Sequence, residues 1–457
     1  MNQKKSPITW IPTAYFAMGL PFVVLNMVAV LMYTDLGVDT ETITFWTSLI
    51  LMPWTFKFLW SPFMEIFGTK KAYVVATQII SGAAFGCVAL ALGLSDFFAI
   101  TIALLAVVAF SGATHDVACD GVYMGELSSA QQSKYIGWQG AFYNIAKIVG
   151  TGLLVYLAGA LFKSFGGSGS EATAVNYAAN QKSWMVVMLI ISAVMILIGV
   201  YHIFFLPSSQ KAEKAVRRSG GEVMHELGSV LMQFFRKRYI WYYIAFIILY
   251  RFAEGFVVKI VPIFLKDATA VGGLGLTNEQ IGLYYGTCGA ATFVLGSLLA
   301  GYYISARGLK KTLFSLALIF NLPFVVYTLF AIIQPTNGLL IASGIGIEYF
   351  GYGFGFVGLT LFMMQQVAPG KHQMAHYAFA SGIMNFGVML PGMLSGFVLK
   401  YLGGYENFFI FVLVATVVPL LITWFVPFKY NDDGTPIDGA VEGTLTGDEG
   451  TLPPSGK

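Results

Sequence analysis

The stretch SWMVVMLIISAVMILIGVYHIFFL, residues 183–206, contains no Asp, Glu, Lys or Arg. An α-helix rises about 1.5 Å per residue, so about 20 apolar residues cross the hydrocarbon core of a bilayer. Similar windows recur along the 457 residues, of which 57% are hydrophobic and 11% charged. A soluble domain carries about a quarter charged residues. The composition therefore argues against a soluble enzyme, a disordered scaffold or a basic nucleic-acid-binding protein, and it predicts a polytopic membrane protein.

Twelve such windows predict an all-α integral membrane fold with 12 transmembrane helices. Runs of this length do not suit a β-barrel, whose strands are about ten residues of alternating character. The predicted spans are 10–33, 42–64, 72–94, 97–124, 135–162 and 183–206, followed by 240–265, 279–305, 312–333, 338–367, 374–402 and 407–426.

The positions of Lys and Arg predict the orientation of these spans. Of the 26 basic residues, 18 lie at the termini or in loops on the side of the termini, 4 lie in loops on the other side, and 4 lie within spans. Because cytoplasmic loops carry the excess of Lys and Arg, we expect both termini to be cytoplasmic.

The longest polar interruption divides the chain into two halves. We expect an N-terminal six-helix bundle at 1–206 and a cytoplasmic linker at 207–238, in which 222–235 forms an amphipathic helix on the membrane surface. A C-terminal six-helix bundle follows at 239–429, and a Gly-, Asp- and Pro-rich tail at 430–457 is predicted to be disordered.

The two halves resemble each other in sequence. The loops 36–43 and 274–281 share Leu, Gly, Glu and Ile at corresponding positions. The turn after the second span carries Gly68, Lys70 and Lys71, and the turn after the eighth carries Gly308, Lys310 and Lys311. Two matched loops in the same order predict a pseudo-symmetric pair of bundles.

The first of these turns, with Gly68, Lys70 and Lys71, resembles together with Glu65 the cytoplasmic loop motif of the major facilitator superfamily. The match is partial, because Ser61 stands where a glycine is usual and Ser305 replaces the acid of the second copy. The resemblance implies alternating access, in which two bundles rock about a site near the bilayer midplane, and it gives the basic pairs a gating role. The alternative is that the basic pairs only anchor these turns at the membrane face.

Eight ionisable residues lie well inside the predicted spans, and an unpaired charge there costs at least roughly 2.5–3.5 kcal/mol. Four are basic and four acidic, which indicates ion pairs facing the bundle interior. They are Lys57, Lys147, Arg251, Lys259, Asp116, Asp120, Glu254 and Glu348. At about 1.5 Å per residue, Arg251, Lys147 and Glu348 come out near the midplane, whereas Lys57, Asp116 and Asp120 lie nearer the cytoplasmic side.

Asp116 and Asp120 share one helical face at i,i+4 and repel each other. One of them is expected to hold a proton unless a cation lies near, and Lys57 could neutralise one when the cytoplasmic side closes. This trio is the predicted proton-coupling site. A permanent ion pair without titration remains the alternative, and sodium remains open as the coupling ion because carboxylates are hard oxygen ligands.

Arg251 and Lys147 are the predicted anchors for an anionic substrate, since the guanidinium fork matches a carboxylate or a phosphate. Glu254, Glu348 and Tyr250 complete the predicted binding site. In the alternative interpretation, Arg251 is fully occupied by its acidic neighbours. Lys259 has no predicted role. No metal site, cofactor motif or catalytic residue is predicted.

Four short segments resemble the AmpG-type muropeptide permeases of the peptide–acetyl-CoA transporter branch. They are Gly19-Leu20-Pro21, the stretch FKFLWSP at 56–62, the stretch ATHDVACD at 113–120, and Leu249-Tyr250-Arg251 with Glu254. The resemblance implies proton-driven symport of anhydro-muropeptides, which are disaccharide-peptides, into the cell across the bacterial inner membrane. His115, Arg251 and Glu254 depart from the family's glutamine, lysine and aspartate, which leaves the substrate open.

Other functions stay open at this stage. A symporter for another oligosaccharide or for an anionic, acetyl-CoA-like solute has the same features, and a non-transporting membrane sensor is a further alternative. An intramembrane aspartyl enzyme is not expected, because Asp116 and Asp120 lie on one helix. The expected partners are a sugar-containing small molecule, protons or sodium, and the lipid bilayer. We expect a monomer and no nucleic acid.

Overall fold

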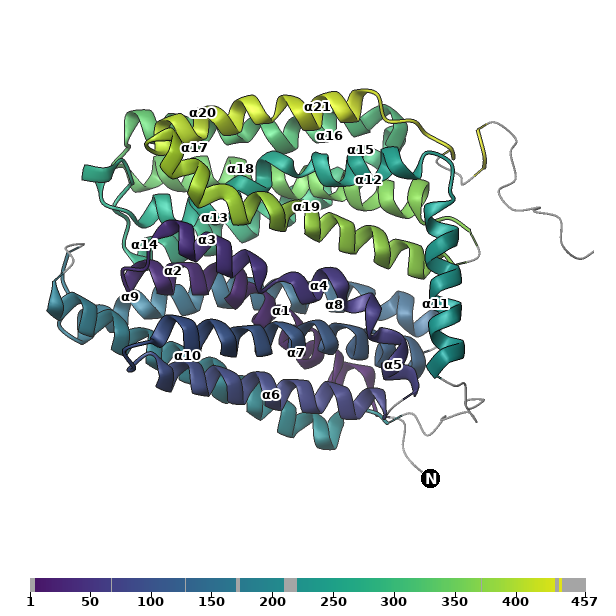
Figure 1. Cartoon of the computed structure of the whole chain (residues 1–457), viewed down its shortest axis with the longest axis horizontal. Helices are drawn as coiled ribbons and strands as arrows, with labels where there is room; N and C mark the ends of the chain where they lie inside the picture. The colour runs from purple at the N-terminus through teal and green to yellow at the C-terminus, as the bar shows by residue number, and fades with distance from the viewer. Residues whose placement is uncertain are drawn as a thin grey trace, which may run out of the picture.

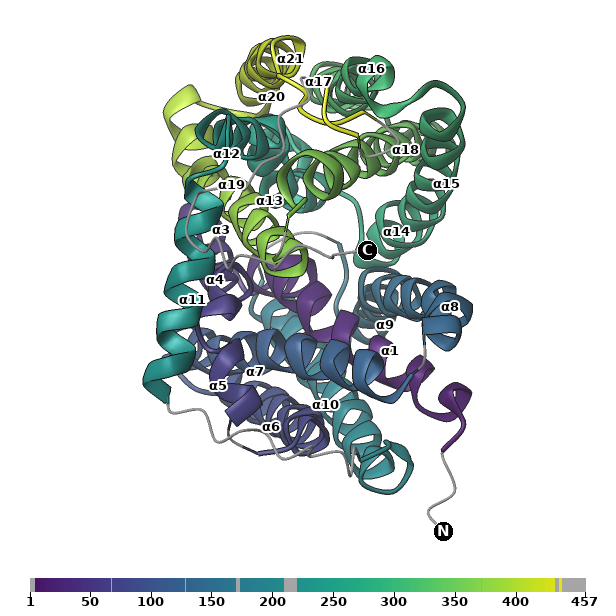
Figure 2. The ribbon, with the colours of Figure 1, turned by 90° about the vertical axis from the view of Figure 1, so that its right-hand side faces the viewer.

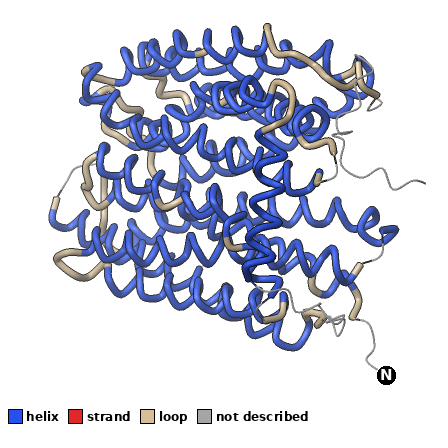
Figure 3. The backbone as a smooth tube through the Cα atoms, turned by 45° about the vertical axis from the view of Figure 1, so that its right-hand side comes forward, coloured by secondary structure: helices blue, strands red, loops and turns tan. Residues whose placement is uncertain are grey.

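The fold is that of a computed structural model, which describes residues 5–66, 68–127, 129–169, 173–208, 220–370, 372–431 and 435–437. Apart from one β-bridge between Tyr430 and Pro436, these residues form helices and connecting loops (Figure 3). The all-α fold predicted from the sequence is confirmed. Most of the predicted tail and residues 209–219 of the predicted linker lie outside the described residues.

The N-terminal half forms ten helices among the described residues. They are α1 (Ile11–Val23), α2 (Ala29–Asp35), α3 (Thr40–Leu49), α4 (Met52–Phe56), α5 (Ser61–Ile66), α6 (Lys70–Ala91), α7 (Phe97–Glu126), α8 (Ser129–Lys147), α9 (Val155–Ser164) and α10 (Ala174–Phe205). Two π-helical segments, Val24–Val28 and Ile148–Leu154, join α1 to α2 and α8 to α9.

The C-terminal half repeats this plan after α11 (Gly220–Phe235), which covers the segment predicted as an amphipathic helix. Its helices are α12 (Ile240–Tyr250), α13 (Phe252–Lys266), α14 (Asn278–Ile281), α15 (Gly289–Arg307), α16 (Leu309–Asn321), α17 (Val325–Ile333), α18 (Gly338–Phe362), α19 (Gln373–Leu402), α20 (Tyr405–Ala415) and α21 (Val417–Trp424). The π-helical segment Gly282–Cys288 joins α14 to α15.

Within the described ranges, ten helices are long and apolar enough to cross a bilayer. The other two predicted spans are present but interrupted. The second is divided among α3, α4 and α5, and Pro53 stands in the first turn of α4, where its missing N–H costs nothing. The seventh breaks at Arg251, between α12 and α13.

The helices form two groups that lie side by side (Figures 1 and 2). The first, α1–α10, is the N-terminal bundle, and α12–α21 form the C-terminal bundle. Helix α11 runs from one group to the other. We call the end of the molecule at which α11 lies the terminal end, because the described chain also starts there and α21 ends there. The opposite end, where α2, α3, α9 and α14 lie, is the distal end.

The apolar core differs between these two ends. Towards the distal end, one continuous cluster of buried side chains joins both bundles, with Leu31 and Ile43 of the first and Phe264 and Ile281 of the second. Towards the terminal end, each bundle has a separate core. The bundles still touch there through Phe58, whose ring centroid is 5.0 Å from that of Phe379.

The matched loops of the two halves share their backbone conformation. Gly68 and Gly308 have φ of +84° and +81°, backbone angles that residues with a Cβ rarely adopt. Gly37 and Gly275, in the other matched loops, have φ of +73° and +65°. The sequence repeat is therefore also a repeat of backbone geometry.

Candidate functional site

A cavity between the two bundles, which we call the central cavity, is the candidate binding site. It borders about 1170 Å³ of space not filled by protein atoms, part of it open to solvent. Both bundles line it. Its aromatic lining residues are Phe22, Trp54, Tyr285, Phe293, Tyr349 and Tyr352, and its polar ones include Asn26, Ser48, Thr55, Asn144, Thr151 and Asn385. Three basic residues, Lys147, Arg251 and Lys259, complete the polar part of the lining.

Arg251 is buried at the break between α12 and α13 and is paired with Glu254. Its Nε and Nη2 atoms donate to the two carboxylate oxygens of Glu254, both at 2.5 Å. Nη2 also lies 3.3 Å from the hydroxyl of Tyr352, and the guanidinium lies 5.3 Å from the ring centroid of Phe356. The predicted proximity of Arg251 and Glu254 is realised, and Glu254 already holds the guanidinium from within the protein.

The two cavity lysines have different surroundings. Lys147 is the last residue of α8, and its ammonium lies 5.3 Å from the ring centroid of Tyr143 and 5.2 Å from that of Phe293. Lys259, which sequence reasoning left without a role, is 2% exposed. It donates across the bundle interface to the backbone carbonyls of Asn26 at 3.1 Å and Thr47 at 3.3 Å.

Besides Glu254, which holds Arg251 from behind the lining, two further residues of the predicted binding site lie outside the cavity lining. Tyr250 is fully buried and donates its hydroxyl to the carbonyl of Gly355 at 2.9 Å. Glu348 is buried on α18 and accepts a hydrogen bond from the Tyr327 hydroxyl at 2.9 Å. Both therefore contribute to packing within the C-terminal bundle in this conformation.

The predicted coupling residues divide into two contacts. Lys57 lies 3.4 Å from Asp116, which also accepts a hydrogen bond at 2.8 Å from Nε1 of Trp54, a cavity residue. Asp120 instead accepts hydrogen bonds from the Tyr15 hydroxyl at 2.8 Å and from the side-chain amide of Gln139 at 3.4 Å. The structure thus places the lysine on Asp116 and gives Asp120 neutral donors.

A buried polar chain lies behind Asp116. His115 accepts a hydrogen bond from the Gln78 amide at 3.0 Å, and Gln78 in turn bonds to His202 at 2.9 Å. His202 bonds to Thr13 at 2.8 Å. Gln78 and His202 escaped sequence reasoning, because a single polar residue in an apolar span does not indicate its partner.

The residues of the predicted gating motif differ between the two halves. The ammonium of Lys71 donates to the carbonyl of Leu206 at 2.8 Å, at the end of α10. The stem of Lys70 packs over Gly121. Lys310 and Lys311 are exposed. The side chain of Glu65 lies outside the described residues.

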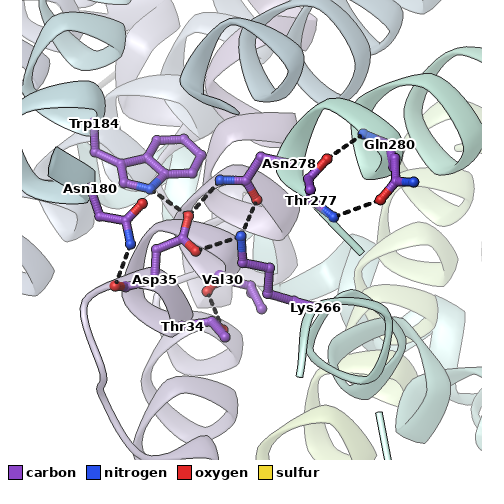
Figure 4. A network of polar contacts seen from close by, with 9 residues as sticks. All are labelled: Val30, Thr34, Asp35, Asn180, Trp184, Lys266, Thr277, Asn278 and Gln280. Carbon is purple, nitrogen blue, oxygen red and sulfur yellow. Dashed lines mark hydrogen bonds and ion pairs between the residues drawn. The ribbon is translucent and has the colours of Figure 1, made fainter. Parts of the chain in front are cut away.

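At the distal end, Asp35 is the centre of a polar network that joins the bundles (Figure 4). It ends α2, its side chain is 1% exposed, and it lies 2.8 Å from Lys266 of the C-terminal bundle. It also accepts hydrogen bonds from Asn278 at 2.6 Å and from Nε1 of Trp184 at 2.9 Å. Lys266 donates in addition to Asn278 at 3.1 Å.

Two further ion pairs at this end also cross between the bundles. Lys163 at the end of α9 lies 2.9 Å from Glu279, and Lys400 at the end of α19 lies 2.6 Å from Glu41. Glu41 and Glu279 are the matched glutamates of the sequence repeat. We call the three cross-bundle pairs, Asp35–Lys266, Lys163–Glu279 and Glu41–Lys400, the distal latch.

Within the described ranges, no group of three or more His, Cys, Asp or Glu side chains is placed to bind a metal ion. The side chains of the site form ion pairs, hydrogen bonds and aromatic contacts between two bundles. An arrangement of this kind can bind a polar solute and can change its shape by breaking and forming ion pairs.

Known proteins resemble this chain in sequence or in fold. The chain is 23% identical over 415 residues to the anhydromuropeptide permease of Escherichia coli strain K12, an alignment that covers 89% of this chain and 77% of that protein. It is 23% identical over 439 residues to an uncharacterized protein of Haemophilus influenzae, covering 92% and 94% of the two chains.

Among solved structures, the D-xylose–proton symporter superposes with a TM-score of 0.66 at 10% identity, covering 94% of this chain and 99% of that one. The nucleoside transporter NupG superposes with a TM-score of 0.62 at 15% identity, covering 93% and 100%. The family profile of the Major Facilitator Superfamily matches residues 13–365. The chain is therefore a multi-pass membrane protein that belongs to the Major Facilitator Superfamily, a family of transporters with the two-bundle fold described above.

Proposed function

We propose that the protein is a proton-coupled symporter that imports muropeptide-like solutes, amino-sugar disaccharides with attached peptide, by alternating access. The observation that carries this proposal is the central cavity, which lies between two pseudo-symmetric bundles and has the basic side chains of Lys147, Arg251 and Lys259 in its lining. The substrate class comes from the relationship to the E. coli anhydromuropeptide permease, which spans most of both chains.

The two ends of the molecule support alternating access. A continuous core and the distal latch join the bundles at the distal end, whereas their cores are separate at the terminal end. We assign the terminal end to the cytoplasm of a bacterial inner membrane, in keeping with the distribution of Lys and Arg. The conformation described then has its periplasmic side closed.

We assign the coupling proton to Asp120. Asp116 has Lys57 as a counter-ion at 3.4 Å, which favours its carboxylate form. The hydrogen-bond donors that the structure describes at Asp120 are neutral, which leaves this carboxyl group as the one of the pair that gains and loses a proton. Asp120 contacts Tyr15 of α1, and Asp116 contacts Trp54 of the cavity wall. A movement of the cavity wall can therefore change the surroundings of the two carboxyl groups.

Uptake into proteoliposomes with an imposed pH gradient tests the proposal. A labelled anhydro-disaccharide-peptide is expected to accumulate, and a protonophore is expected to abolish accumulation. A sodium gradient without a pH gradient identifies sodium coupling instead. Uptake of plain disaccharides in preference to the wall fragment would contradict the proposed substrate.

Asp120→Asn is expected to abolish gradient-driven accumulation while solute exchange across the membrane continues. Asp96→Asn is the matched control, because Asp96 is exposed and lies outside the helices that line the cavity. Equal loss of exchange and accumulation in Asp120→Asn would remove Asp120 from the coupling role.

A further inference from the structure

The charge of the central cavity is unbalanced. Its lining contains three basic side chains, from Lys147, Arg251 and Lys259, and no Asp or Glu among the residues that the structure describes there. Charges at this depth in a membrane protein face an interior cavity or a partner of opposite sign. The groups that surround the positive charge differ among the three side chains.

Arg251 carries no net charge into the cavity. Glu254 accepts two hydrogen bonds from its guanidinium, and the two groups are 8% and 6% exposed. A carboxylate that pairs with both donors neutralises the arginine. It also occupies the guanidinium N–H groups with which Arg251 would bind a carboxylate of the solute. The net positive charge of the cavity thus comes from the two lysines.

Lys147 brings one of these charges from the N-terminal bundle. Its described contacts are with the faces of Tyr143 and Phe293, at 5.3 and 5.2 Å. Aromatic faces attract a cation through their quadrupoles but carry no net charge. In the described part of the chain, the ammonium of Lys147 has no carboxylate within 4 Å.

Lys259 brings the second charge from the C-terminal bundle, and neutral oxygens hold it. In an uninterrupted helix the Leu51 N–H would bond to the Thr47 carbonyl, but it bonds to Ser48 instead, at 3.1 Å. The carbonyl of Thr47 is thereby free to accept from Lys259. The other acceptor, the carbonyl of Asn26, lies in the π-helical segment Val24–Val28.

The wall beside Lys259 also offers unused hydrogen-bonding groups. The hydroxyls of Ser48 and Thr55 are buried, line the cavity, and have no hydrogen-bond partner in the described structure. A hydroxyl donates readily to a carboxylate or a phosphate. A buried polar group left without a partner is costly, so a bound anion would stabilise this wall.

We propose that Lys147 and Lys259 are the two charged anchors of the central cavity and that its solute carries two anionic groups, one for each bundle. The inference rests on the proposed function only in taking this cavity as the transport site. A solute of this kind would bridge the bundles, because each anchor comes from a different one. Lys259 would exchange its bonds to neutral carbonyls for a charge-assisted bond, which is stronger.

The first test is a binding titration of the purified full-length protein with three probes of similar shape. N-acetylglutamate has two carboxylates, N-acetylglutamine has one, and N-acetylglutamine amide has none. We expect the affinity to fall about tenfold with each carboxylate removed. Equal affinity for the three probes would overturn the proposal, and so would binding of none of them.

The second test assigns the two charges. Lys147→Gln and Lys259→Met are each expected to lower the affinity for N-acetylglutamate about tenfold and to leave that for the neutral amide unchanged. Lys147→Arg keeps the charge and is expected to keep the discrimination. Lys182→Gln is the control, because this lysine is exposed and does not line the cavity. Unchanged discrimination in the two charge-removing variants would overturn the assignment, and Tm measurements on each variant separate a local loss of binding from unfolding.

Comparison of a wall fragment with its carboxyl-amidated form separates this inference from the proposed function. Uptake of both forms at the same rate leaves the proposed function standing and overturns the two-anion inference. If N-acetylglutamate binds with the expected dependence on the two lysines but no wall fragment is taken up, the two-anion inference stands and the proposed function is overturned.

Discussion

The two ends of the molecule hold the bundles together by different means. At the distal end the three ion pairs of the latch all cross from one bundle to the other, over a continuous apolar core. Towards the terminal end, the ion pair Lys57–Asp116 lies within the N-terminal bundle, and the cores are separate there in the described part of the chain. The position of a pair relative to the interface, rather than its strength, therefore decides whether it can hold one side closed.

The pairs of the latch also differ among themselves. Asp35 has 1% of its side chain exposed and gathers partners from three elements, whereas the lysines of the other two pairs are 64% and 77% exposed. Exposed pairs contribute about 0–1 kcal/mol, whereas breaking a buried pair costs about 3–5 kcal/mol. Most of the energy of the latch is thus expected at Asp35.

Removal of the charge of Asp35 is therefore expected to have the largest effect on the distal end. Asp35→Asn removes the buried carboxylate that pairs with the partly exposed Lys266, so it is expected to destabilise the closed end by more than the loss of an exposed pair would, about 0–1 kcal/mol, and by at most about 3–5 kcal/mol. Spin labels at Ser164→Cys and Glu406→Cys, on opposite bundles, are expected to move apart in this variant. The measurement needs a background in which Cys87, Cys119 and Cys288 are replaced.

Asp96→Asn is the matched control for Asp35→Asn, because it removes an exposed aspartate next to the distal end without touching the interface. Its label distances are expected to equal those of the unsubstituted protein. If Asp35→Asn gave the same distances as this control, the buried pair would have no part in closing the distal end.

The fold was accessible from the sequence because hydropathy is a local property of about 20 residues. The charged residues were found in the same way, and the proximity of Arg251 and Glu254 followed from their spacing of three. The depth of a residue along its helix, however, does not show which way its side chain points around the helix axis. Glu348 came out near the midplane and Lys259 had no predicted role, but of the two only Lys259 lines the central cavity.

The distal latch escaped sequence reasoning because its partners are far apart in the chain. A usable signal was present in the repeat, where Glu41 matches Glu279. Lys163 and Lys400 end the fifth and the eleventh span, which are the corresponding helices of the two halves. Since corresponding helices face each other across a pseudo-two-fold axis, two matched glutamates and two matched lysines predict two reciprocal pairs.

A substitution within one bundle at the distal end provides a contrast to the latch. Asp39 is the N-cap of α3 and accepts a hydrogen bond from the backbone N–H of Thr42 at 2.9 Å. Asp39→Ala is expected to cost about 1 kcal/mol of stability. The label distances across the bundles are expected to change little, because the hydrogen bond lies within the N-terminal bundle and Asp39 acts on the C-terminal bundle only as a weak charge near the exposed Lys400.

The stabilisation from Asp39 is expected to depend on pH. Hydrogen bonds from Thr42 lower the pKa of Asp39. A carboxyl group whose pKa is lower in the folded state stabilises the protein above its unfolded pKa of about 3.9, and this contribution is lost as the pH falls through the folded value. The difference in Tm between the unsubstituted protein and Asp39→Ala should therefore shrink between pH 5 and pH 3. A difference that stayed constant over that range would contradict this account.

The smallest effects are expected at the reciprocal pairs, which test the pseudo-symmetry of the latch. Lys163→Ala and Lys400→Ala should each weaken the closed end only slightly, because both lysines are exposed. Because the pairs are related by the repeat, the two variants should change the label distances equally, and both effects should disappear in high salt. Lys182→Ala serves as the exposed control.

The exchange Lys163→Glu with Glu279→Lys should restore the distances that either single change disturbs, since the attraction is kept and only the positions of the two charges are exchanged. If only Lys163→Ala changed the label distances, and Lys400→Ala gave the distances of the control, the two pairs would contribute unequally to closing the distal end. The repeat would then explain the fold of this end but not the energy that holds it closed.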